Sequence, residues 1–471
     1  MKKIIYLLLS VYLFNGCSLD ETVYSSLGES NYFKNESDAE ALLNSAYAPE
    51  QRRSFRNYLI MAEIPAGVFY DRNGGLEALA KPFELFTWDA THEFFSSAWQ
   101  THYQTVYCSN LILDQVPAIN MDENIKEQIL AEARFLRASA YVILDDLFGP
   151  VPLILTSNTS ATDKPSRPSE EEFNSFIETE FRAVSKILPA TPRNYGRATK
   201  GAALSQLTKF YLNNKKWKES AETAKEVIDL GIYALYDSPH RTDLFDPLNE
   251  VNSEFIYIRP NLANSYGTNF IGHVAPPSYK WKGNTKENYA TQFKTYTSFY
   301  NSFEEGDERR DAFITQYENL SGQIVQLGKD DIRNFKFQED LTASGANSGN
   351  DYPVIRYADI LLSRAEALNE LSGPNEESVG LINQVRLKAK IKPLLLQNYS
   401  STKELRDAIF QERGWEFFSE ELRRQDLIRQ GVFIQQAKDR GIVAVKDYHV
   451  LYPIPLSEIN LNPNLKQNEG Y

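Results

Sequence analysis

The sequence predicts a mostly α-helical protein in which a scaffold of helical hairpins carries one long, loop-rich region. Three observations support this prediction. Apolar or small residues recur at helical spacing through residues 125–147 and form one buried stripe. Two further pairs of helical segments, 199–230 and 356–389, are each divided by a short turn. Between these pairs, residues 233–350 are turn-rich and punctuated throughout by Gly and Pro.

Composition and charge restrict the class of protein. With 471 residues, of which 42% are hydrophobic, the chain can bury a large core. Its formal net charge of −13 argues against nucleic acid as a partner, because nucleic-acid binding normally needs a basic face. The chain also has 27 Tyr and 27 Phe, which is many for a helical protein. Most of these rings should pack in the core, and some should serve a surface.

The first residues, 1–16, have the pattern of a secretory signal peptide. A basic start is followed by an apolar segment, 4–14, that is too short to span a bilayer. The next residues, Asn15-Gly16-Cys17, resemble the lipobox of a bacterial lipoprotein, whose cysteine is acylated and becomes the mature N-terminus. We therefore expect lipidation of Cys17. The alternative is an ordinary signal peptide that happens to contain a cysteine.

The residues after Cys17 are expected to form a lipid-anchored tether, 17–35, and a single folded domain is expected over 36–471. An acidic run at 18–21 resembles the signal that exports some lipoproteins to the cell surface. If Cys17 is acylated, Cys108 has no partner, so we expect no internal disulfide.

The N-terminal part of the domain is expected to alternate helices with two loops. A helix capped by Ser37 should run to Tyr47, and a second should cover 55–60. The segment 67–75 mixes aromatic and charged residues, an amide and two glycines, which suits either an exposed binding loop or an ordinary connection. The aromatic segment 88–95 is interpreted as another loop, and the helical pattern then resumes at Trp99.

The strongest helical pattern, 125–147, is predicted to form the central core helix. Ala131, Ala133, Ala138 and Ala140 would let other helices approach closely. Gly149, Pro150 and Pro152 should end this helix sharply, because proline cannot continue the hydrogen-bond ladder. We expect this helix to be scaffold, with binding left to the loops.

The helical hairpins resemble degenerate tetratricopeptide repeats. In the first, Leu204, Leu207 and Tyr211 face a partner helix that begins at Trp217. The pair at 356–389 is comparable, and a last helix pair is expected at 402–429. Such units bury one face only by stacking on their neighbours, so a continuous helical stack is expected.

The region 233–350 is predicted to carry function, because a loop-rich insertion of this length is uncommon otherwise. It is too aromatic to be disordered. Its asparagines and aromatic residues alternate along the chain: Asn261, Asn264, Tyr266, Asn269, Tyr279, Trp281, Asn284, Asn288, Tyr289, Phe293 and Tyr296.

An ordered set of short motifs makes the whole mature chain resemble the SusD/RagB family of surface nutrient-binding lipoproteins. One departure is Glu421, where the family usually has Gly. The matching residues are scaffold, not ligand contacts: Ala131 to Ala138 with Phe148-Gly149-Pro150-Val151-Pro152-Leu153; Ile355 to Leu362 with Ala365 to Asn369; Ile382 to Arg386; Glu412-Arg413 with Glu416-Phe417 and Asp426 to Arg429; and Tyr452 to Pro455 with Asn462 to Leu465 and Gln467 to Tyr471.

This resemblance implies a SusD-like fold of tetratricopeptide-like hairpins with irregular loops as the ligand face. It also implies a lipid anchor in the outer membrane, facing the cell surface, and a SusC-like TonB-dependent transporter as partner. The implied ligand is a glycan oligosaccharide. The alternative is the same architecture binding peptides or glycoproteins for uptake.

Binding a sugar without catalysis needs flat aromatic faces together with amides and charged groups for the hydroxyls. Two loop regions offer this combination, although for each aromatic residue the alternative is packing in the core. The candidate glycan-binding residues are Asp71, Arg72, Asn73 and Trp88 in the first region and Tyr279, Trp281, Tyr289 and Tyr296 in the second.

We expect no catalytic residue, no metal site and no cofactor. His92 and His102 do not have metal-ligand spacing with other candidates. The acidic residues of 304–311 suggest paired carboxylates for glycoside hydrolysis, which would make the protein a secreted hydrolase. Arg309 and Arg310 lie among them, however, so a solvated charge cluster is expected there instead.

Overall fold

The computed structural model of the chain describes residues 33–160, 162–283, 288–289 and 292–471. The expected signal peptide 1–16, Cys17 and most of the tether 17–35 lie outside the described residues. No helix among the described residues is long and apolar enough to cross a membrane.

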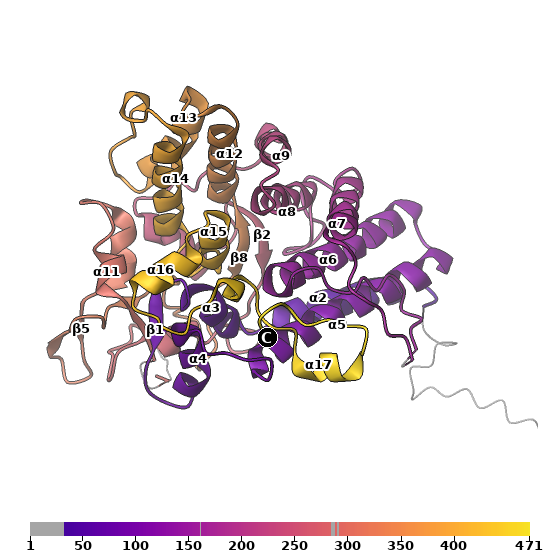
Figure 1. Cartoon of the computed structure of the whole chain (residues 1–471), viewed down its shortest axis with the longest axis horizontal. Coiled ribbons are helices and arrows are strands. Elements are labelled where there is room, and N and C mark those ends of the chain that lie inside the picture. Colours follow the sequence, from indigo (N-terminus) through magenta and orange to yellow (C-terminus); the bar gives the residue numbers. More distant parts are fainter. Residues whose placement is uncertain (1–32, 161, 284–287, 290–291) are drawn as a thin grey trace, which may run out of the picture.

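Three long helices pack together at the N-terminal side of the molecule (Figure 1). They are α2 (Glu36–Arg52), α5 (Glu93–Gln115) and α6 (Glu123–Phe148). The first begins earlier than predicted, because Asn35 instead of Ser37 accepts the capping hydrogen bond from the Asp38 N–H.

The central helix is confirmed as α6. Its expected stripe is buried, and the small residues Ala131, Ala133, Ala138 and Ala140 are at most 1% exposed. Asp122 caps its start, and Gly149 ends it with a φ of 71°, a backbone conformation that favours glycine. The buried guanidinium of Arg137 donates to Asn110 Oδ1 at 2.8 Å and to Glu180 Oε2 at 3.0 Å. Hydrogen bonds from a charged side chain therefore hold this helix in the core, in addition to its apolar contacts.

The predicted hairpins are present and stack on one another. Neighbouring helices contact in the order α6, α7, α8, α9, α12, with α13 and α14 both against α12. Figure 1 shows them as an arc from the N-terminal helices to the top of the molecule. The bounds are α7 (Glu170–Val184), α8 (Lys200–Asn213), α9 (Trp217–Asp229), α12 (Tyr357–Ser372), α13 (Glu376–Lys388) and α14 (Thr402–Glu416).

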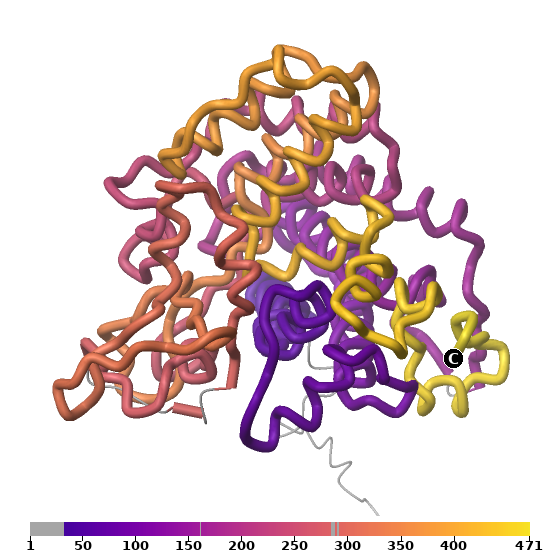
Figure 2. The backbone as a smooth tube through the Cα atoms, turned by 60° about the vertical axis from the view of Figure 1, so that its left-hand side comes forward, coloured from indigo at the N-terminus to yellow at the C-terminus, as the bar shows by residue number. Residues whose placement is uncertain are grey.

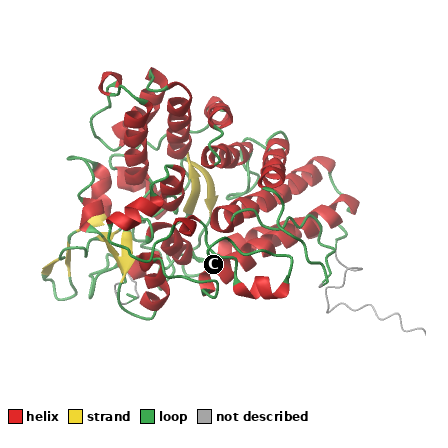
Figure 3. Cartoon of the chain, in the orientation of Figure 1, coloured by secondary structure: helices red, strands yellow, loops and turns green. Residues whose placement is uncertain are grey.

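The insertion 233–350 is turn-rich, as predicted, and its short elements form a lobe beside the indigo segment near the start of the described chain (Figure 2). Strand β2 (Phe255–Arg259) pairs antiparallel with β8 (Tyr352–Arg356), which leads directly into α12. Figure 3 shows this pair at the centre of the molecule. The other described elements are β3 (Phe293–Thr295), β4 (Phe313–Ile314), β5 (Gln316–Glu318), β6 (Ile324–Gln326), β7 (Arg333–Asn334), α10 (Phe270–Val274) and α11 (Thr297–Tyr300).

Shorter elements complete the fold. Strand β1 (Phe69–Asp71) lies between α3 (Phe55–Glu63) and α4 (Leu76–Leu85). After α14 the chain forms α15 (Arg423–Arg429), α16 (Phe433–Asp439) and α17 (Leu456–Leu461). The described 3-10 turns are Val116–Ala118, Arg241–Phe245, Pro247–Asn249, Glu308–Ala312, Leu396–Asn398 and Asp447–Val450.

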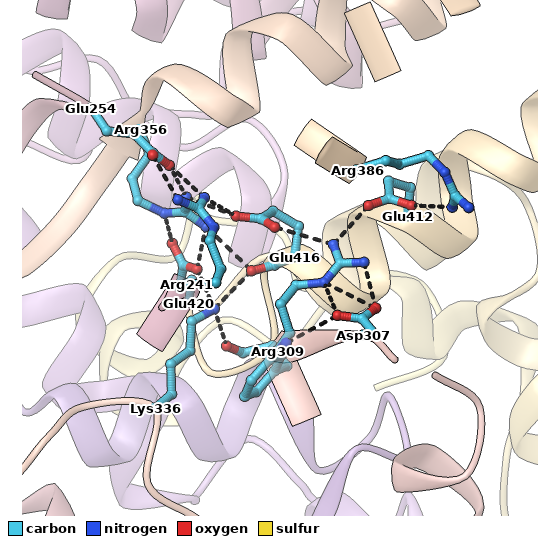
Figure 4. A network of polar contacts seen from close by, with 11 residues as sticks. Arg241, Glu254, Asp307, Arg309, Lys336, Arg356, Arg386, Glu412, Glu416 and Glu420 are labelled. Atoms are coloured by element: carbon cyan, nitrogen blue, oxygen red, sulfur yellow. Dashed lines mark hydrogen bonds and ion pairs between the residues drawn. The ribbon is translucent and has the colours of Figure 1, made fainter. Parts of the chain in front are cut away.

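A buried ion network joins the insertion to the helical stack (Figure 4). Glu416 accepts hydrogen bonds from Arg241 at 2.5 Å, Arg356 at 3.0 Å and Arg309 at 3.1 Å. Arg309 also pairs with Asp307 at 2.7 Å and with Glu412 at 2.7 Å. Of these residues, Arg241, Asp307 and Arg309 come from the insertion.

The prediction of a solvated charge cluster at 304–311 is therefore wrong for Asp307 and Arg309, which are each only 3% exposed. Their charges are buried because each finds an oppositely charged partner, which burial requires. Glu305 and Asp311 are exposed, as expected.

Glu421, which stands where the resemblance expects Gly, has a φ of 62°. This left-handed conformation costs a side-chain-bearing residue about 1–2 kcal/mol. Its carboxylate accepts a hydrogen bond from Arg53 at 2.5 Å, and this partly buried ion pair offsets the cost.

Candidate ligand-binding surface

Two candidate loops that are far apart in sequence are brought together by a short strand pair. In β1 and β3, Phe69 lies opposite Thr295 and Asp71 lies opposite Phe293. The Arg72 N–H extends the pairing with a hydrogen bond to the Gln292 carbonyl at 3.0 Å. The candidates Asp71, Arg72 and Asn73 thus lie beside the strand that leads to Tyr296. The Gln292 amide, which donates to the Asn73 carbonyl at 3.2 Å, connects them through His273 to Tyr289. We call this region the β1–β3 surface and define it by Tyr70, Arg72, Asn73, Tyr289 and Tyr296.

An arginine between a carboxylate and an aromatic ring organises one end of this surface. The Arg72 guanidinium lies 4.7 Å from the centroid of the Tyr70 ring, and that ring is 4.9 Å from the Tyr296 ring. Arg72 donates to both carboxylate oxygens of Glu84, at 2.6 and 2.9 Å, and the Tyr296 hydroxyl donates to Glu84 at 3.2 Å. Burial, followed by the charge of Glu84, raises the pKa of Tyr296. The rings and the guanidinium are therefore held in place, while the Arg72 side chain stays 36% exposed.

The other end of the surface rests on a buried histidine. The His273 ring stacks on Tyr289 with the ring centroids 4.7 Å apart, and its Nδ1 lies 2.6 Å from Gln292 Oε1. Burial lowers the pKa of His273 to about 4, so the ring is neutral at neutral pH. Its role in this arrangement is to support Tyr289.

Asp71 points inward beneath the surface. It is 2% exposed, and neither carboxyl oxygen has a hydrogen-bond partner among the described residues. Burial, and then the nearby charge of Glu77, raise the pKa of Asp71 to about 7. The charge of this group therefore changes near neutral pH.

Two more candidates form an adjoining pair. The Tyr279 and Trp281 rings meet edge to face at 5.1 Å, and the Tyr279 hydroxyl donates to Glu339 at 3.1 Å. The Pro276 carbonyl connects this pair to the β1–β3 surface, because it accepts from both the Tyr279 N–H at 3.2 Å and the Asn288 amide at 2.7 Å. Tyr279 and Trp281 are both partly exposed.

Trp88 lies apart from the other candidates, in the core. It is 5% exposed, its Nε1 donates to the Tyr471 hydroxyl at 2.8 Å, and its ring contacts Phe86 and Tyr452. The C-terminal residues cover it, so it presents no free ring face to a ligand. We therefore leave Trp88 out of the binding surface.

Sequence reasoning did not identify Tyr70, Glu84, His273 or Gln292, which the structure places at this surface. Tyr70 had a local signal, since it is the outward residue of the alternating stretch Phe69-Tyr70-Asp71. Glu84 and Gln292 act through partners that are distant in sequence, and nothing in their immediate neighbourhood indicates this.

Among the described residues there is no group of three or more His, Cys, Asp or Glu side chains that could hold a metal ion. His273 instead bonds to Gln292 and packs on Tyr289, and Glu84 accepts from Arg72 and Tyr296.

Comparisons with known proteins cover both ends of the chain. A family model described as "SusD family" matches residues 331–471, and one described as "Starch-binding associating with outer membrane" matches residues 19–212. The chain is 26% identical to SusD-like protein P2 of Formosa agariphila, with 100% of this chain and 99% of that protein covered. It is 25% identical to the starch-binding protein SusD of Bacteroides thetaiotaomicron, with 77% and 76% covered.

Solved structures agree with the fold. A SusD superfamily protein from Parabacteroides distasonis matches with a TM-score of 0.80 and 24% identity, over 95% of this chain and 100% of that one. A laminarin-binding SusD-like protein matches with a TM-score of 0.78 and 25% identity, over 93% and 100% of the two chains. The predicted SusD-like helical fold is thus confirmed.

The family has two properties that bear on the sequence predictions. It is associated with the outer membrane, and its glycan-binding members are non-catalytic, in agreement with the prediction that this chain is not an enzyme. The motifs of the scaffold, the fold and the similarity along the full length agree on one assignment: the chain belongs to the SusD/RagB family of SusD-like proteins.

Proposed function

We propose that this protein is a cell-surface lipoprotein that binds glycan oligosaccharides without catalysis and passes them to a SusC-like TonB-dependent outer-membrane transporter. The observation that carries the proposal is the β1–β3 surface, where Arg72 is held between Glu84 and the Tyr70 ring. The names of similar proteins support it, since one binds starch and another binds laminarin.

The chemistry of the surface suits a neutral sugar. Tyrosine rings provide flat faces for the C–H side of a pyranose, and guanidinium, amide and carboxylate groups provide hydrogen bonds for its hydroxyls. Asn73 is exposed at the edge of the surface, and Trp281 lies on the adjoining pair. Because the rings are held before a ligand arrives, little side-chain entropy is lost on binding.

The test is the loss of one ring face. Tyr296→Ala is expected to weaken oligosaccharide binding about tenfold, which corresponds to about 1.4 kcal/mol, because the ring is lost and Glu84 loses a partner. Isothermal titration with laminari- and malto-oligosaccharides measures this. The matched control is Tyr107→Ala on α5, whose side chain is 50% exposed and lies outside the surface.

Two results would refute the glycan proposal. One is equal loss of binding in Tyr107→Ala and Tyr296→Ala. The other is no binding of any oligosaccharide by the unaltered protein, and binding of peptides in the same titration would then favour peptide or glycoprotein uptake.

The lipid anchor is a separate part of the proposal, with 17–35 as the tether of a single domain, 36–471. Cys17→Ala is expected to move the protein from the outer-membrane fraction to the soluble fraction, because acyl chains supply the durable membrane affinity. Immunoblots of separated fractions measure this. Cys108→Ala is the matched control, since Cys108 is the other cysteine of the chain and is free. Membrane retention of Cys17→Ala would contradict the anchor.

A further inference from the structure

A cavity lies beside the start of α3, apart from the residues of the β1–β3 surface. It is a cavity of about 260 Å³ between the end of α2, the start of α3 and two segments of the insertion. We call it the arginine–amide cavity. Its lining residues are Gln51, Arg52, Arg53, Ser54, Phe55, Arg259, Asn261, Ser265, Tyr266, Gly267, Thr268, Asn269, Phe337, Asn347, Asn350 and Tyr352.

The charge of the lining is opposite to that of the whole protein. The chain carries a formal net charge of −13, yet the lining includes Arg52, Arg53 and Arg259 and, among the described residues, no Asp or Glu. The cavity is thus a local positive site on an acidic protein. Such a site attracts anions and repels the cations that the rest of the surface favours.

Arg259 is the central group, because its charge is only weakly balanced. It is 7% exposed, and its Nε and Nη2 have no hydrogen-bond partner among the described residues. Its nearest acidic oxygen is Glu421 Oε1, at 3.9 Å from Nη2. The guanidinium lies 4.3 Å from the centroid of the Tyr352 ring, which holds it in place. Buried N–H donors without acceptors are costly, so an acceptor that enters this cavity gains directly.

The neighbouring Arg53 shows the contrast. Its Nη2 donates to Glu421 at 2.5 Å, and its Nε lies 3.6 Å from Glu50. The Glu421 carboxylate thus pairs first with Arg53, and the Glu50 carboxylate lies closest to His102 Nδ1, at 2.7 Å. Arg259 is left with longer contacts.

The rest of the wall offers neutral donors. The side chains of Gln51, Ser265, Tyr266, Asn269 and Asn347 line the cavity and make no hydrogen bond to another described residue. Gly267 allows its segment to approach closely, since a Cβ there would lie 2.3 Å from the Ser348 carbonyl oxygen. Thr268 and Ser348 then exchange two backbone hydrogen bonds of 2.9 Å. These two hydrogen bonds join the segment that carries Ser265, Tyr266 and Asn269 to the segment that carries Asn347.

From these observations we propose that the arginine–amide cavity binds an oxyanion, the sulfate ester or the carboxylate of a charged sugar. A guanidinium presents paired N–H donors that match two oxygens of such a group, and surrounding amides and hydroxyls can donate to the others. The volume is below the roughly 300–1,000 Å³ of sites for drug-sized ligands, so it suits one substituent or ring.

That the ligand is a sugar rests on the proposed function. The arginine–amide cavity and the β1–β3 surface are connected through α10. Asn269 lines the cavity and directly precedes α10, and His273 near the end of α10 supports Tyr289 of the β1–β3 surface. A glycan with charged substituents would find a neutral-ring surface and an anion site on neighbouring elements.

Isothermal titration at constant ionic strength tests the inference, with inorganic sulfate, glucose 6-sulfate, glucuronate and glucose as probes. We expect inorganic sulfate and at least one charged sugar to bind. Asn347→Asp should weaken their binding about tenfold or more, since it adds a negative charge to the lining. Asn319→Asp on the β5–β6 hairpin is the matched control, because its Oδ1 accepts from the N–H groups of Ser321 and Gln323 and keeps that role as a carboxylate.

Arg259→Lys gives a second readout. It keeps the positive charge and removes the paired donors, so anion binding should weaken while the melting temperature stays close to that of the unaltered protein. If Arg259→Lys unfolds, Asn347→Asp still decides the question. The preference between glucose 6-sulfate and glucuronate shows whether the natural group is a sulfate ester or a carboxylate.

The inference fails if no anionic probe binds the unaltered protein, or if Asn347→Asp binds anions as tightly as Asn319→Asp does. Inorganic sulfate contains no sugar, so its binding is independent of the proposed function. If sulfate binds and depends on Asn347, while no oligosaccharide binds at the β1–β3 surface, the anion site stands and the glycan proposal falls.

Discussion

Replacing Glu416 by alanine is expected to lower the free energy of unfolding by about 3–5 kcal/mol, the usual effect of removing one partner from a buried ion pair. Glu416 is 2% exposed and accepts hydrogen bonds from Arg241, Arg309 and Arg356 (Figure 4). Without the Glu416 carboxylate, the three buried guanidinium groups lose the acceptor that they share.

The pH dependence of this effect has a definite sign. Burial alone would raise the pKa of Glu416, but the charges of Arg241, Arg356 and Arg309 outweigh it and hold the pKa well below its ordinary value. A carboxyl whose pKa is lowered by folding contributes stability above its unfolded pKa, and that contribution is lost as the pH falls toward the folded value. The difference between Glu416→Ala and the unaltered protein should therefore shrink in acid.

Urea unfolding followed by circular dichroism at pH 7 and pH 4 measures both effects. Glu222→Ala on α9 is the control, because its side chain is 61% exposed and its nearest Lys218 contact is 4.0 Å long. It should change stability by no more than about 0.5 kcal/mol. A loss below about 1 kcal/mol for Glu416→Ala at pH 7 would show that the network is dispensable.

The second large effect is expected at Glu63 on α3. Ionisation of its carboxyl group should lower the stability of the fold, whereas ionisation of Glu416 raises it. It is fully buried, neither carboxyl oxygen has a hydrogen-bond partner among the described residues, and burial raises its pKa to about 8. A carboxyl with a raised pKa contributes stability fully below its unfolded value of about 4.5 and loses it as the pH rises through about 8.

Glu63→Gln should remove this dependence, because the amide stays neutral at every pH. Near pH 5 the variant should be about as stable as the unaltered protein. At pH 9 it should be more stable by up to about 5 kcal/mol, since the pKa rises from 4.5 to about 8 on folding and one pKa unit corresponds to about 1.4 kcal/mol. Urea unfolding at pH 5, 7 and 9 measures this, with Glu222→Gln as the exposed control. A stability difference that does not vary with pH would contradict the buried, neutral state of Glu63.

Local patterns in the sequence were sufficient to predict the helical scaffold. The apolar stripe of 125–147 and the Gly149–Pro150 stop define α6 to within two residues at its start. The hairpins at 199–230 and 356–389 follow from the same kind of local signal. Helices are stabilised by contacts between residues three or four apart, so short segments of the sequence are enough to predict where they lie.

The arrangement of the candidate site could be predicted only in part, because it depends on contacts between distant segments. The segment 67–75 and the region 233–350 are predicted from their mixture of aromatic and polar residues, but nothing in either predicts that 69–71 pairs with 293–295. Trp88 resembled an exposed loop residue since polar Thr87 and Asp89 flank it, yet Tyr471 covers it. Asp307 is predicted to be solvated because it lies in a short run of charged residues. In the structure Arg309 donates both to Asp307 and to Glu412, which lies about a hundred residues later and is not visible in any local pattern.

The ion network also bears on the order in which the molecule assembles. Arg241 and Glu416 are separated by 175 residues along the chain, and Arg309 and Glu412 by 103. During synthesis, the arginines of the insertion emerge long before α14 supplies their carboxylates. Because closing such long loops is slow and unpaired charges resist burial, we expect the insertion to reach its final form late, after the last helices of the stack have docked.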